Sequence, residues 1–479
     1  MDILTLINGF ANGLMKLQEK FMEQNRFDEL EKAASELGTA TIAQFLKLTL
    51  EETDELIRES GIRRRDFNVQ RRIERTLITT VGDVTFSRTQ FKSRSDGSVH
   101  FLLDELMGLP PKERFSEQAE AKVLGVASER SYQKAADSLK IREQSVSKVT
   151  VMEKVHAIRD VFRGEEDLAE NRKKWCDYLY IEADEDHIHE QGGEPGSRGF
   201  MGKLIYIYEG KEDLCKGKRK LISPHYCGGL YRGSDNNSEL WESVQRYIEG
   251  HYNTEILKCV YISGDGANWI RAGVDHVDKS VFVLDRFHLM KYINSVANLT
   301  LDDKSWAKGK IYKYIYQDKP VALKKFLTRI KNCCGGEEIV ESCRTYLIEN
   351  WEAVQRTFHD KHLYGCSAEG HVSHVYSERM SSRPMGWGET GSDSMCHLRC
   401  YVRNHGKEKI IDLVRYRREQ ELARRKMTGT EDILEATAIR KHRTKTQKEI
   451  GRYWEKMQVS IGGDTVRKTL AIRERIAEL

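Results

Sequence analysis

The stretch YLYIEAD at residues 178–184 decides the expected fold, because it is an apolar strand that ends on carboxylates. A second stretch of this kind, LKCVYISGD at residues 257–265, closes on Asp265, which lies between Gly264 and Gly266. The two glycines allow a tight turn that exposes the Asp265 side chain. Together with the strand and helix patterns that follow, these stretches indicate an α/β fold with carboxylates gathered where strands end.

A third carboxylate, Glu369, stands in SAEGH at residues 367–371, at the start of a predicted helix. Oxygen ligands suit Mg²⁺, which usually takes one or two protein carboxylates and keeps waters and substrate oxygens. Two such ions about 3.5–4 Å apart can activate the nucleophile and stabilise the leaving oxygen of a phosphodiester. We therefore expect Asp184, Asp265 and Glu369 to hold two Mg²⁺ (or Mn²⁺) ions in a catalytic site.

Neighbouring acids leave two of these positions open. Glu182 and Asp186 point the same way as Asp184 if the strand continues, because side chains alternate along a strand. Glu378 competes with Glu369 for the third position. An Asp at a strand end or a Glu at a helix start is also common as an ordinary cap.

Ten cysteines are scattered through the chain, which favours reduced thiols in a cytoplasmic protein over a disulfide framework. Six possible zinc ligands fall within a short stretch: Cys366, His371, His374, Cys396, His397 and Cys400. Zinc prefers such nitrogen and sulfur sets, but the paired spacing of a zinc ribbon is missing. Reduced core thiols are therefore the simpler interpretation.

The chain divides into four expected regions. They are a helical region at 1–60, a basic β element with a helix-turn-helix-like pair at 61–156, a catalytic domain at 170–404 with an all-helical insertion at about 297–360, and a basic helical tail at 405–479. Strand patterns in the catalytic domain fall at 177–184, 201–208, 219–227, 256–263 and 280–284, with a helix at 239–252. This order is consistent with an α/β sheet of the ribonuclease-H type, flanked by helical N-terminal and C-terminal regions.

Local signals refine the first two regions. Thr41 and Thr49 offer N-caps for further short helices. The alternating stretch Val81–Phe91 predicts a strand, and the pair Asp96–Gly97 predicts a hairpin turn before Val99–Leu103.

Basic residues gather in two parts of a chain whose net charge is only +4. Residues 61–100 hold nine Lys and Arg against four Asp and Glu, and residues 401–479 hold twenty against twelve. Basic surfaces favour a polyanion such as double-stranded DNA, although solvated helix faces give the same pattern. Helices expected at 132–139 and 144–156 resemble a helix-turn-helix, whose second helix could enter a major groove. The expected DNA contacts are Arg63, Arg64, Arg65, Arg71, Arg72, Lys148, His288, Arg379 and Arg383, with a structural role open for the lone His288.

Several long motifs resemble one known family. They are RTLITTVGDV at 75–84, YIEADEDH at 180–187, SGDGANWI at 263–270, LDRFHL at 284–289 and AEGHVSH at 368–374, continuing into RMSSRPMGW at 379–387. With these motifs, from about residue 60 to 400, the chain resembles the Lre-type bacterial insertion-sequence transposases, also filed as an uncharacterised protein family. The resemblance implies a DDE-type transposase with a ribonuclease-H-like core and Asp184, Asp265 and Glu369 as metal ligands.

The expected function follows from the acids and this resemblance. The protein would bind the terminal inverted repeats of its insertion sequence, cleave the strands there and join them to target DNA. Two ends must be held together, so a homo-oligomer is expected. No apolar run long enough for a membrane span and no signal peptide are present, so the expected location is the cytoplasm. A non-catalytic DNA-binding relic and a ribonuclease-H-like nuclease without a joining step are the alternatives.

Overall fold

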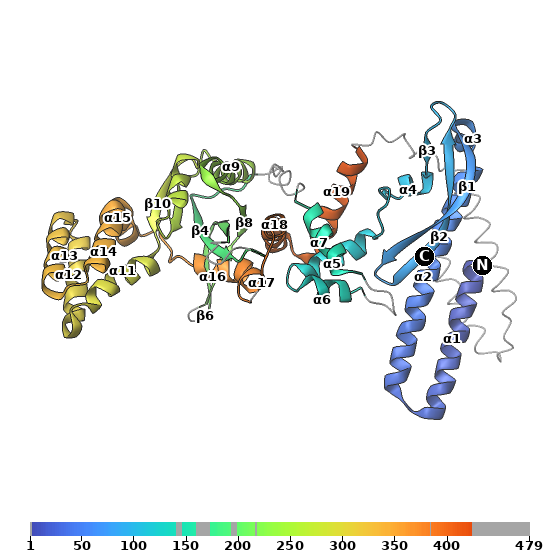
Figure 1. Cartoon of the computed structure of the whole chain (residues 1–479), viewed down its shortest axis with the longest axis horizontal. Coiled ribbons are helices and arrows are strands. Elements are labelled where there is room, and N and C mark those ends of the chain that lie inside the picture. The colour runs from blue at the N-terminus through green and yellow to red at the C-terminus, as the bar shows by residue number, and fades with distance from the viewer. Residues whose placement is uncertain are drawn as a thin grey trace. The chain divides into compact units, whose positions relative to one another are not determined.

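The computed structural model describes residues 2–139, 146–159, 173–192, 199–215, 218–383 and 385–423. The chain is a mixed α/β protein that divides into two compact units (Figure 1). In its described part the first unit comprises residues 2–119 and 418–423, and the second comprises residues within 120–417. No helix in these described ranges is long and apolar enough to cross a membrane.

The first unit packs a helical hairpin and a small antiparallel sheet. Its elements are α1 (Ile3–Gln24), α2 (Phe27–Glu59), α3 (Gly61–Asp66), β1 (Phe67–Thr79), β2 (Gly82–Ser93), β3 (Val99–His100) and α4 (Leu102–Leu106), with strand order β1-β2-β3. Leu50 and Ile57 of α2 share one core with Val84, Phe86 and Phe91 of β2. The core therefore lies between the C-terminal half of α2 and the hairpin.

One local prediction for this unit is wrong, and a second is confirmed but incomplete. Thr41 and Thr49 do not begin new helices, because each hydroxyl donates to a backbone oxygen four residues earlier, Leu37 O at 2.8 Å and Phe45 O at 3.0 Å. Such back-bonding leaves a helix continuous, and α2 runs through both residues. The predicted strand at Val81–Phe91 is present as β2, but it pairs with the longer preceding strand β1, which the basic sequence did not predict.

A five-stranded mixed sheet forms the centre of the second unit (Figure 1). Its strands are β4 (Tyr178–Ile188), β5 (Phe200–Tyr208), β8 (His225–Leu230), β9 (Cys259–Gly264) and β10 (Ser280–Leu284), in the spatial order β10-β9-β4-β5-β8. β5 is antiparallel to β4 and β8, whereas β4, β9 and β10 are mutually parallel. Helix α9 (Gly233–His251) connects β8 to β9, and α10 (Asn268–Arg271) with η1 (Ala272–Asp275) connects β9 to β10.

One predicted strand, at 219–227, is two strands in the structure. β7 (Lys218–Ile222) pairs with β6 (Gly210–Cys215) in a separate hairpin, and β8 starts at His225. Ser223 between them has a left-handed backbone, with φ of 49°, and Pro224 has no N–H to donate to a ladder. Two pairs of apolar residues, Leu221–Ile222 and Tyr226–Cys227, flank this break, and the sequence prediction joins them into a single strand.

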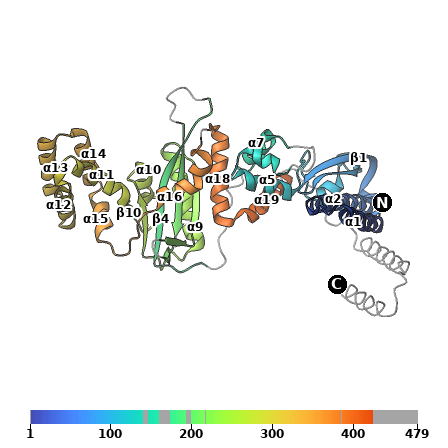
Figure 2. The same cartoon turned by 90° about the horizontal axis from the view of Figure 1, so that it is seen from below.

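The two faces of β4 have different surroundings. Leu179, Ile181 and Ala183 share a core with Leu240 and Trp241 of α9. Because strand side chains alternate, the even-numbered residues of β4 point to the opposite face, on which α16 (Ala368–Val372) packs (Figure 2). The acidic positions of β4 therefore lie on the α16 face and not on the α9 face.

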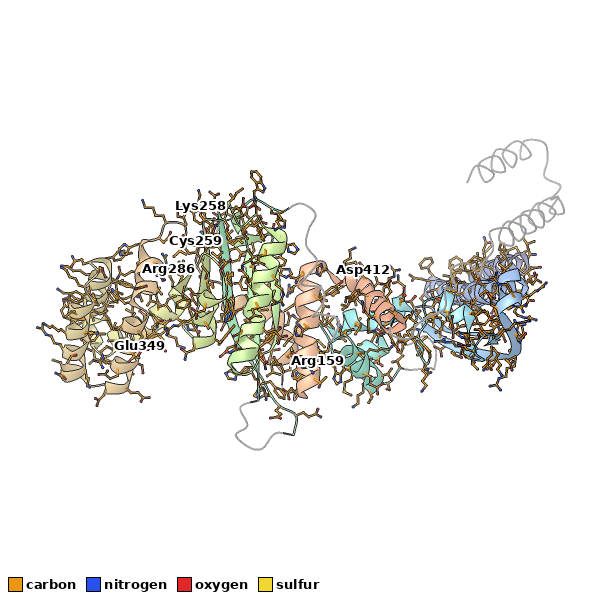
Figure 3. The ribbon with its side chains drawn as sticks, turned by 90° about the horizontal axis from the view of Figure 1, so that it is seen from above. Arg159, Lys258, Cys259, Arg286, Glu349 and Asp412 are labelled. Atoms are coloured by element: carbon orange, nitrogen blue, oxygen red, sulfur yellow. The ribbon has the colours of Figure 1, made fainter. Side chains whose placement is uncertain are left out.

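The core of the sheet continues into five helices that follow β10. These are α11 (Arg286–Asn298), α12 (Lys304–Tyr316), α13 (Pro320–Cys334), α14 (Glu337–Glu349) and α15 (Trp351–His359), with η2 (Leu301–Asp303) after α11. Their buried residues belong to the same apolar cluster as the sheet. The Arg286 guanidinium (labelled in Figure 3) donates to Thr357 O at 2.7 Å, and the Thr357 hydroxyl donates to Leu284 O at 3.1 Å. These bonds hold α15 against the end of β10.

Among the remaining helices of the second unit, α18 packs on β8. These remaining helices are α5 (Glu117–Ala127), α6 (Tyr132–Asp137), α7 (Lys148–Ala157), η3 (Ser373–Ser377), α17 (Glu378–Met380), α18 (Glu389–His405), η4 (Lys407–Lys409) and α19 (Ile410–Ala423), of which α5 and α19 extend beyond the unit. α6 and α7 pack on each other as the helix-pair pattern predicts, and α7 packs on α18. The Arg159 guanidinium after α7 donates to the Asp393 carboxylate of α18 at 2.7 Å (Figure 3). The predicted basic tail beyond residue 423 lies outside the described residues.

Candidate active site

Two of the expected acids lie at the ends of adjacent parallel strands. Glu182 of β4 pairs in register with Ser263 of β9. Two residues further along each chain, Asp184 and Asp265 come level with each other and face the same side. Neighbouring strands lie about 4.8 Å apart, so this register brings the two aspartates together at one edge of the sheet.

A third aspartate, Asp285, extends this row, although it is not among the predicted ligands. Gly264 of β9 pairs with Leu284 of β10, so that Asp265 and Asp285 follow the two strands at the same level. The Asp285 N–H donates to Gly264 O at 2.9 Å, which continues the ladder to this residue. The row therefore runs across three adjacent strands, and the signal for Asp285 was an acid directly after a predicted strand, as for Asp265.

Burial and the neighbouring carboxylate both raise the pKa of Asp184 in this row. Burial raises the pKa of Asp184 to about 6, and the negative charge of Asp265 contributes to the rise. A hydrogen bond from the Glu185 N–H and the nearby His288 act in the opposite direction. The metal-free fold therefore disfavours a full charge on Asp184.

Glu369 is connected electrostatically to the row through Asp285. Burial raises the pKa of Asp285, and the charges of Glu182 and Glu369 add to the rise. The Phe287 N–H donates to Asp285 Oδ1 at 2.9 Å, and His288 Nε2 lies 3.9 Å from Asp285 Oδ2. His288, predicted as a DNA contact, thus lies beside the acids.

The donor chemistry of the row fits a hard divalent cation. Asp184 Oδ1 accepts a hydrogen bond from Glu185 N at 2.9 Å, and Asp265 Oδ1 accepts one from Ala267 N at 2.8 Å. The second oxygen of each aspartate has no hydrogen bond to any residue in the described ranges. In those same ranges no three His, Cys, Asp or Glu side chains converge closely enough to hold a metal ion. The argument that a divalent cation fits this row therefore depends on the available carboxylate oxygens and on the strand register. It does not depend on a complete set of metal ligands in the structure.

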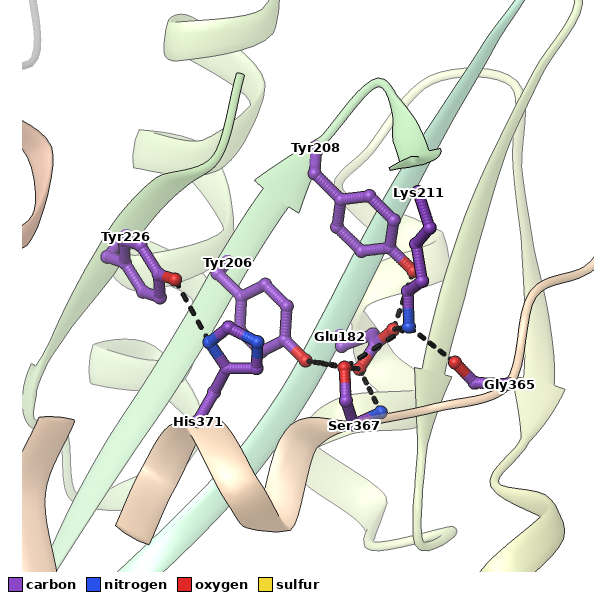
Figure 4. Close-up of polar contacts among 8 residues, drawn as sticks. All are labelled: Glu182, Tyr206, Tyr208, Lys211, Tyr226, Gly365, Ser367 and His371. Atoms are coloured by element: carbon purple, nitrogen blue, oxygen red, sulfur yellow. Dashed lines mark hydrogen bonds and ion pairs between the residues drawn. The ribbon is translucent and has the colours of Figure 1, made fainter. Parts of the chain in front are cut away.

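Glu182, an alternative to Asp184 in the sequence, is fully engaged (Figure 4). Its carboxylate accepts hydrogen bonds from the hydroxyls of Tyr206 and Tyr208, the latter at 2.6 Å, from Lys211 Nζ at 2.8 Å and from Ser367 N at 2.5 Å. Burial would raise the pKa of Glu182, but the Lys211 ammonium and these donors outweigh it, and the pKa is lowered. Glu182 is therefore a buried structural carboxylate and not an available ligand.

The Glu182 network fixes the segment that precedes Glu369. Lys211 Nζ also donates to Gly365 O and, at 3.1 Å, to the Ser367 hydroxyl (Figure 4). Two residues along α16 from Glu369, His371 Nδ1 lies 2.9 Å from the Tyr226 hydroxyl, which gives α16 a second tie to the sheet. Glu369 itself is exposed and lies in the first turn of this short helix. The network thus holds α16, whose first turn includes Glu369, against β4.

The other acidic alternatives lie elsewhere. β4 continues through Asp186, as the alternative requires, but the Asp186 carboxylate accepts a hydrogen bond from the Ser381 hydroxyl at 2.7 Å. Glu378 is exposed and lies 4.0 Å from Arg399. Neither continues the row formed by Asp184 and Asp265.

The cysteines considered for zinc include two buried residues of α18. Cys396 Sγ lies 3.9 Å from Met380 Sδ, and Cys400 Sγ lies 3.5 Å from the Tyr376 hydroxyl. Burial raises the pKa of the Cys396 thiol well above its ordinary value. This environment is that of core thiols.

The basic residues predicted to contact DNA in the first unit are mostly engaged within it. Arg63 lies over the Phe91 ring at 5.9 Å, Arg65 pairs with Asp66 at 2.8 Å, Arg71 donates to Gln90 at 2.8 Å and Arg72 lies 3.8 Å from Asp54. Arg64 is exposed and has no ion-pair partner in the described part of the chain. Arg71 and Arg72 remain exposed on β1, but as consecutive strand residues they point to opposite faces of the sheet.

In the second unit, the prediction that Arg379 and Arg383 grip a phosphate together is wrong for Arg379. Arg379 is buried, donates to Ala127 O at 3.0 Å and stacks 4.8 Å from the Trp387 ring, so it is unavailable to a ligand. Arg383 is exposed, as is Lys148 at the first position of α7.

Known proteins resemble this chain over most of its length. A family model described as "Uncharacterised protein family (UPF0236)" matches residues 20–418. The chain belongs to the UPF0236 family. This UPF0236 chain is 33% identical over 407 residues to a UPF0236 protein of Caldanaerobacter subterraneus subsp. tengcongensis, and the match covers 84% of each chain. It is 24% identical over 391 residues to a UPF0236 protein in the vanSb 3′ region of Streptococcus gallolyticus, and that match covers 78% of this chain and 83% of the relative.

Among solved structures, the UPF0236 chain is similar to the Drosophila P element transposase strand transfer complex. The sequence identity is 9%, the match covers 65% of this chain and 85% of the other, and the TM-score is 0.20. A TM-score this low carries no conclusion about fold or function.

Proposed function

We propose that this protein is a DDE-type DNA transposase. It binds the ends of its insertion sequence, hydrolyses a strand at each end and joins the freed 3′-hydroxyl to target DNA. The observation that carries the proposal is the row of Asp184, Asp265 and Asp285 across three adjacent parallel strands, with Glu369 on the helix that packs over the same face.

The connectivity of the sheet supports a ribonuclease-H-like core for this site. The first three strands of this sheet along the chain, β4, β5 and β8, pair antiparallel, and the separate hairpin of β6 and β7 comes between β5 and β8. A helical crossover then leads to β9 and β10, which add in parallel on the other side of β4. This arrangement places the first and fourth of the five strands side by side, and these strands carry Asp184 and Asp265.

The naming of the relatives adds independent support. One relative in Caldanaerobacter subterraneus subsp. tengcongensis has a name made of eleven joined locus designations. Another relative in the same organism has a name made of four. We interpret the joined designations as copies of one protein at several sites in one genome. A protein encoded by a mobile element is expected to show this pattern.

The residues have distinct roles in the proposed reaction. Asp184 and Asp265 would hold divalent cations, with Glu369 as the third predicted ligand and Asp285 beside them. Bound Mg²⁺ or Mn²⁺ supplies charge stabilisation and lowers the pKa of a coordinated water. His288 Nε2 lies 3.9 Å from Asp285 Oδ2, which is beyond hydrogen-bond distance, so its proposed role is to approach a substrate oxygen beside the acids. Two ends must be cut in one event, so the active form is a homo-oligomer on DNA.

The test is strand cleavage and joining by the full-length chain. The substrate is a labelled duplex that carries the ends of the DNA segment encoding the protein, incubated with Mg²⁺ or Mn²⁺. Asp184→Asn, Asp265→Asn and Glu369→Gln should each reduce both products by more than about 100-fold, because even residues behind metal ligands commonly cost 10–100-fold. Glu212→Gln, at an exposed site on β6, is the matched control and should retain activity.

Other outcomes separate the alternatives. Nicked ends without a joined product would identify a ribonuclease-H-like nuclease. Binding without any metal-dependent cutting would identify a DNA-binding relic. Full activity in Asp184→Asn or Asp265→Asn would refute the assigned site.

A further inference from the structure

A basic cleft of about 850 Å³ opens in the second unit, away from the row of acids. One wall is the turn after α5 together with the start of α6. The other wall is α17, the loop that follows it and the C-terminal end of α18 with η4. Seven of the lining side chains are Lys or Arg and three are Glu, which gives the cleft a formal charge of +4.

Two buried arginines hold the walls together. Arg379 donates to Ala127 O at 3.0 Å, and Arg399 donates to Ser128 O and, at 2.6 Å, to His374 O. The bonds to Ala127 and Ser128 satisfy carbonyls at the C-terminal end of α5, where a helix leaves carbonyl oxygens without partners. The two walls of the cleft are therefore joined by hydrogen bonds, and the guanidinium groups of Arg379 and Arg399 are occupied by these bonds.

Four other cations face the cleft without a carboxylate partner. Arg130, Lys134, Arg383 and Arg403 are exposed, and none forms an ion pair with any residue that the structure describes, although Arg403 donates a hydrogen bond to His374 O at 3.0 Å. Of the three glutamates, by contrast, Glu129 pairs with Lys407 at 2.5 Å and Glu378 lies 4.0 Å from Arg399. The cations of the cleft that these two glutamates leave unneutralised are thus the four exposed ones and the buried Arg379, and Glu408 is the remaining acid of the lining.

Repulsion from neighbouring cations adds to the effect of burial on Arg379. Burial lowers the pKa of Arg379 to about 10, and the charges of Arg399 and Arg383 contribute to the lowering. A bound anion would relieve this repulsion.

The lining also indicates which part of a nucleic acid would bind. Among the described residues that line the cleft, none is aromatic and none is Asn or Gln. Base stacking uses aromatic platforms, and base reading relies on side chains such as Asn and Gln as well as Arg, whereas exposed Arg and Lys alone suit phosphates. The cleft is also open and spread over two walls, which suits a polymer better than an enclosed small anion.

We propose that this basic cleft binds the sugar-phosphate backbone of duplex DNA, independently of base sequence, through Arg130, Lys134, Arg383 and Arg403. That the bound polymer is DNA rests on the proposed function. The DNA-binding surface proposed here is the basic cleft, which is separate from the row of Asp184, Asp265 and Asp285.

The test is equilibrium binding of the full-length chain to a labelled duplex in EDTA, over a range of salt concentrations. The quadruple variant Arg130→Ala, Lys134→Ala, Arg383→Ala and Arg403→Ala should bind roughly 10–100-fold more weakly near physiological salt. The slope of log affinity against log salt should fall by about 0.9 for each phosphate that the variant no longer neutralises. The four side chains are exposed, so the thermal unfolding of this variant should match that of the wild type.

The matched control removes four exposed cations of α12 and α13 in the same unit, Lys313, Lys324, Lys325 and Arg329, as alanines. Unchanged duplex binding by this control, with weaker binding by the cleft variant, supports the proposal. Equal weakening in both variants, wild-type binding by the cleft variant, or a weakening confined to RNA or to inorganic pyrophosphate would each overturn it. No cutting is measured, so a protein that binds DNA through this cleft but never cleaves it would refute only the proposed transposase activity.

Discussion

Asp184 carries a charge that the metal-free fold disfavours. Burial and the charge of Asp265 raise its pKa to about 6, above the ordinary value of 3.8. A raised pKa means that protonation of Asp184 favours the folded state. This stabilisation is fully present below about pH 3.8 and is lost as the pH rises through about 6.

Asp184→Asn should therefore stabilise the metal-free protein at pH 7.5, because it removes the buried charge. We expect a rise in the unfolding temperature of roughly 1–2 °C, because a change of about 1 kcal/mol shifts a protein of 150–250 residues by roughly 2–4 °C and a longer chain by less. The gain should shrink towards zero near pH 4. Differential scanning calorimetry in EDTA over this pH range measures it, with Asp275→Asn at an exposed position as the control. A gain that does not depend on pH, or a decrease at pH 7.5, contradicts the assigned electrostatics.

The sequence predicts Asp184 and Asp265 because each closes an apolar stretch, and Asp285 has the same signal after the strand pattern at 280–284. What the sequence lacks is the register that puts Asp285 beside Asp265. The sequence also could not decide whether Glu182 or Asp184 is the available ligand, because that too depends on contacts between distant segments. Both point to the same face, and only the donors supplied by distant residues such as Lys211 and Ser367 distinguish them.

At the scale of elements, the hairpin of β6 and β7 has a specific task. It supplies Lys211, whose ammonium joins Glu182 of β4 to the segment before α16. The sequence prediction misses this hairpin, because it joins the apolar pairs Leu221–Ile222 and Tyr226–Cys227 into one strand across Ser223 and Pro224. Long helices and the main strands were predictable from periodicity, whereas this short pairing depends on a local backbone break.

The pair of Glu182 and Lys211 should be strongly coupled in stability. Glu182→Gln or Lys211→Met alone leaves a buried charge without its partner, at a cost of about 3–5 kcal/mol. The double variant removes both charges, so it should cost less than the sum of the single variants by at least about 1 kcal/mol. Urea unfolding at pH 7.5 measures the free energies.

An exposed pair in the same unit provides the control for this cycle. Lys258 Nζ lies 2.8 Å from Asp177, with both side chains more than half exposed (62% and 52%). Its coupling should be no more than about 1 kcal/mol. If the Glu182 and Lys211 variants are additive within about 0.5 kcal/mol, the network does not hold the segment before Glu369 as described.

At the scale of the whole molecule, the α/β character and the helices after β10 were predictable from patterning. The sequence suggests an inserted helical region at about 297–360, and the structure shows that these helices share one core with the sheet. Strand order could not be derived, because it depends on pairing between segments far apart in the chain. β4 and β9, for example, are neighbours in the sheet although β5, β8 and α9 lie between them in the chain.

The central claim for the molecule is that the acids of the row bind divalent cations. Mn²⁺ binding to the full-length chain, followed by electron paramagnetic resonance at pH 7.5 without DNA, tests this most directly. We predict Mn²⁺ binding by the wild type that weakens more than about tenfold in Asp184→Asn and in Asp265→Asn, because each substitution removes a ligand charge. The control Glu212→Gln should bind as the wild type does. Equal Mn²⁺ binding by the wild type and both aspartate variants, or none by the wild type at millimolar Mn²⁺, would contradict the account.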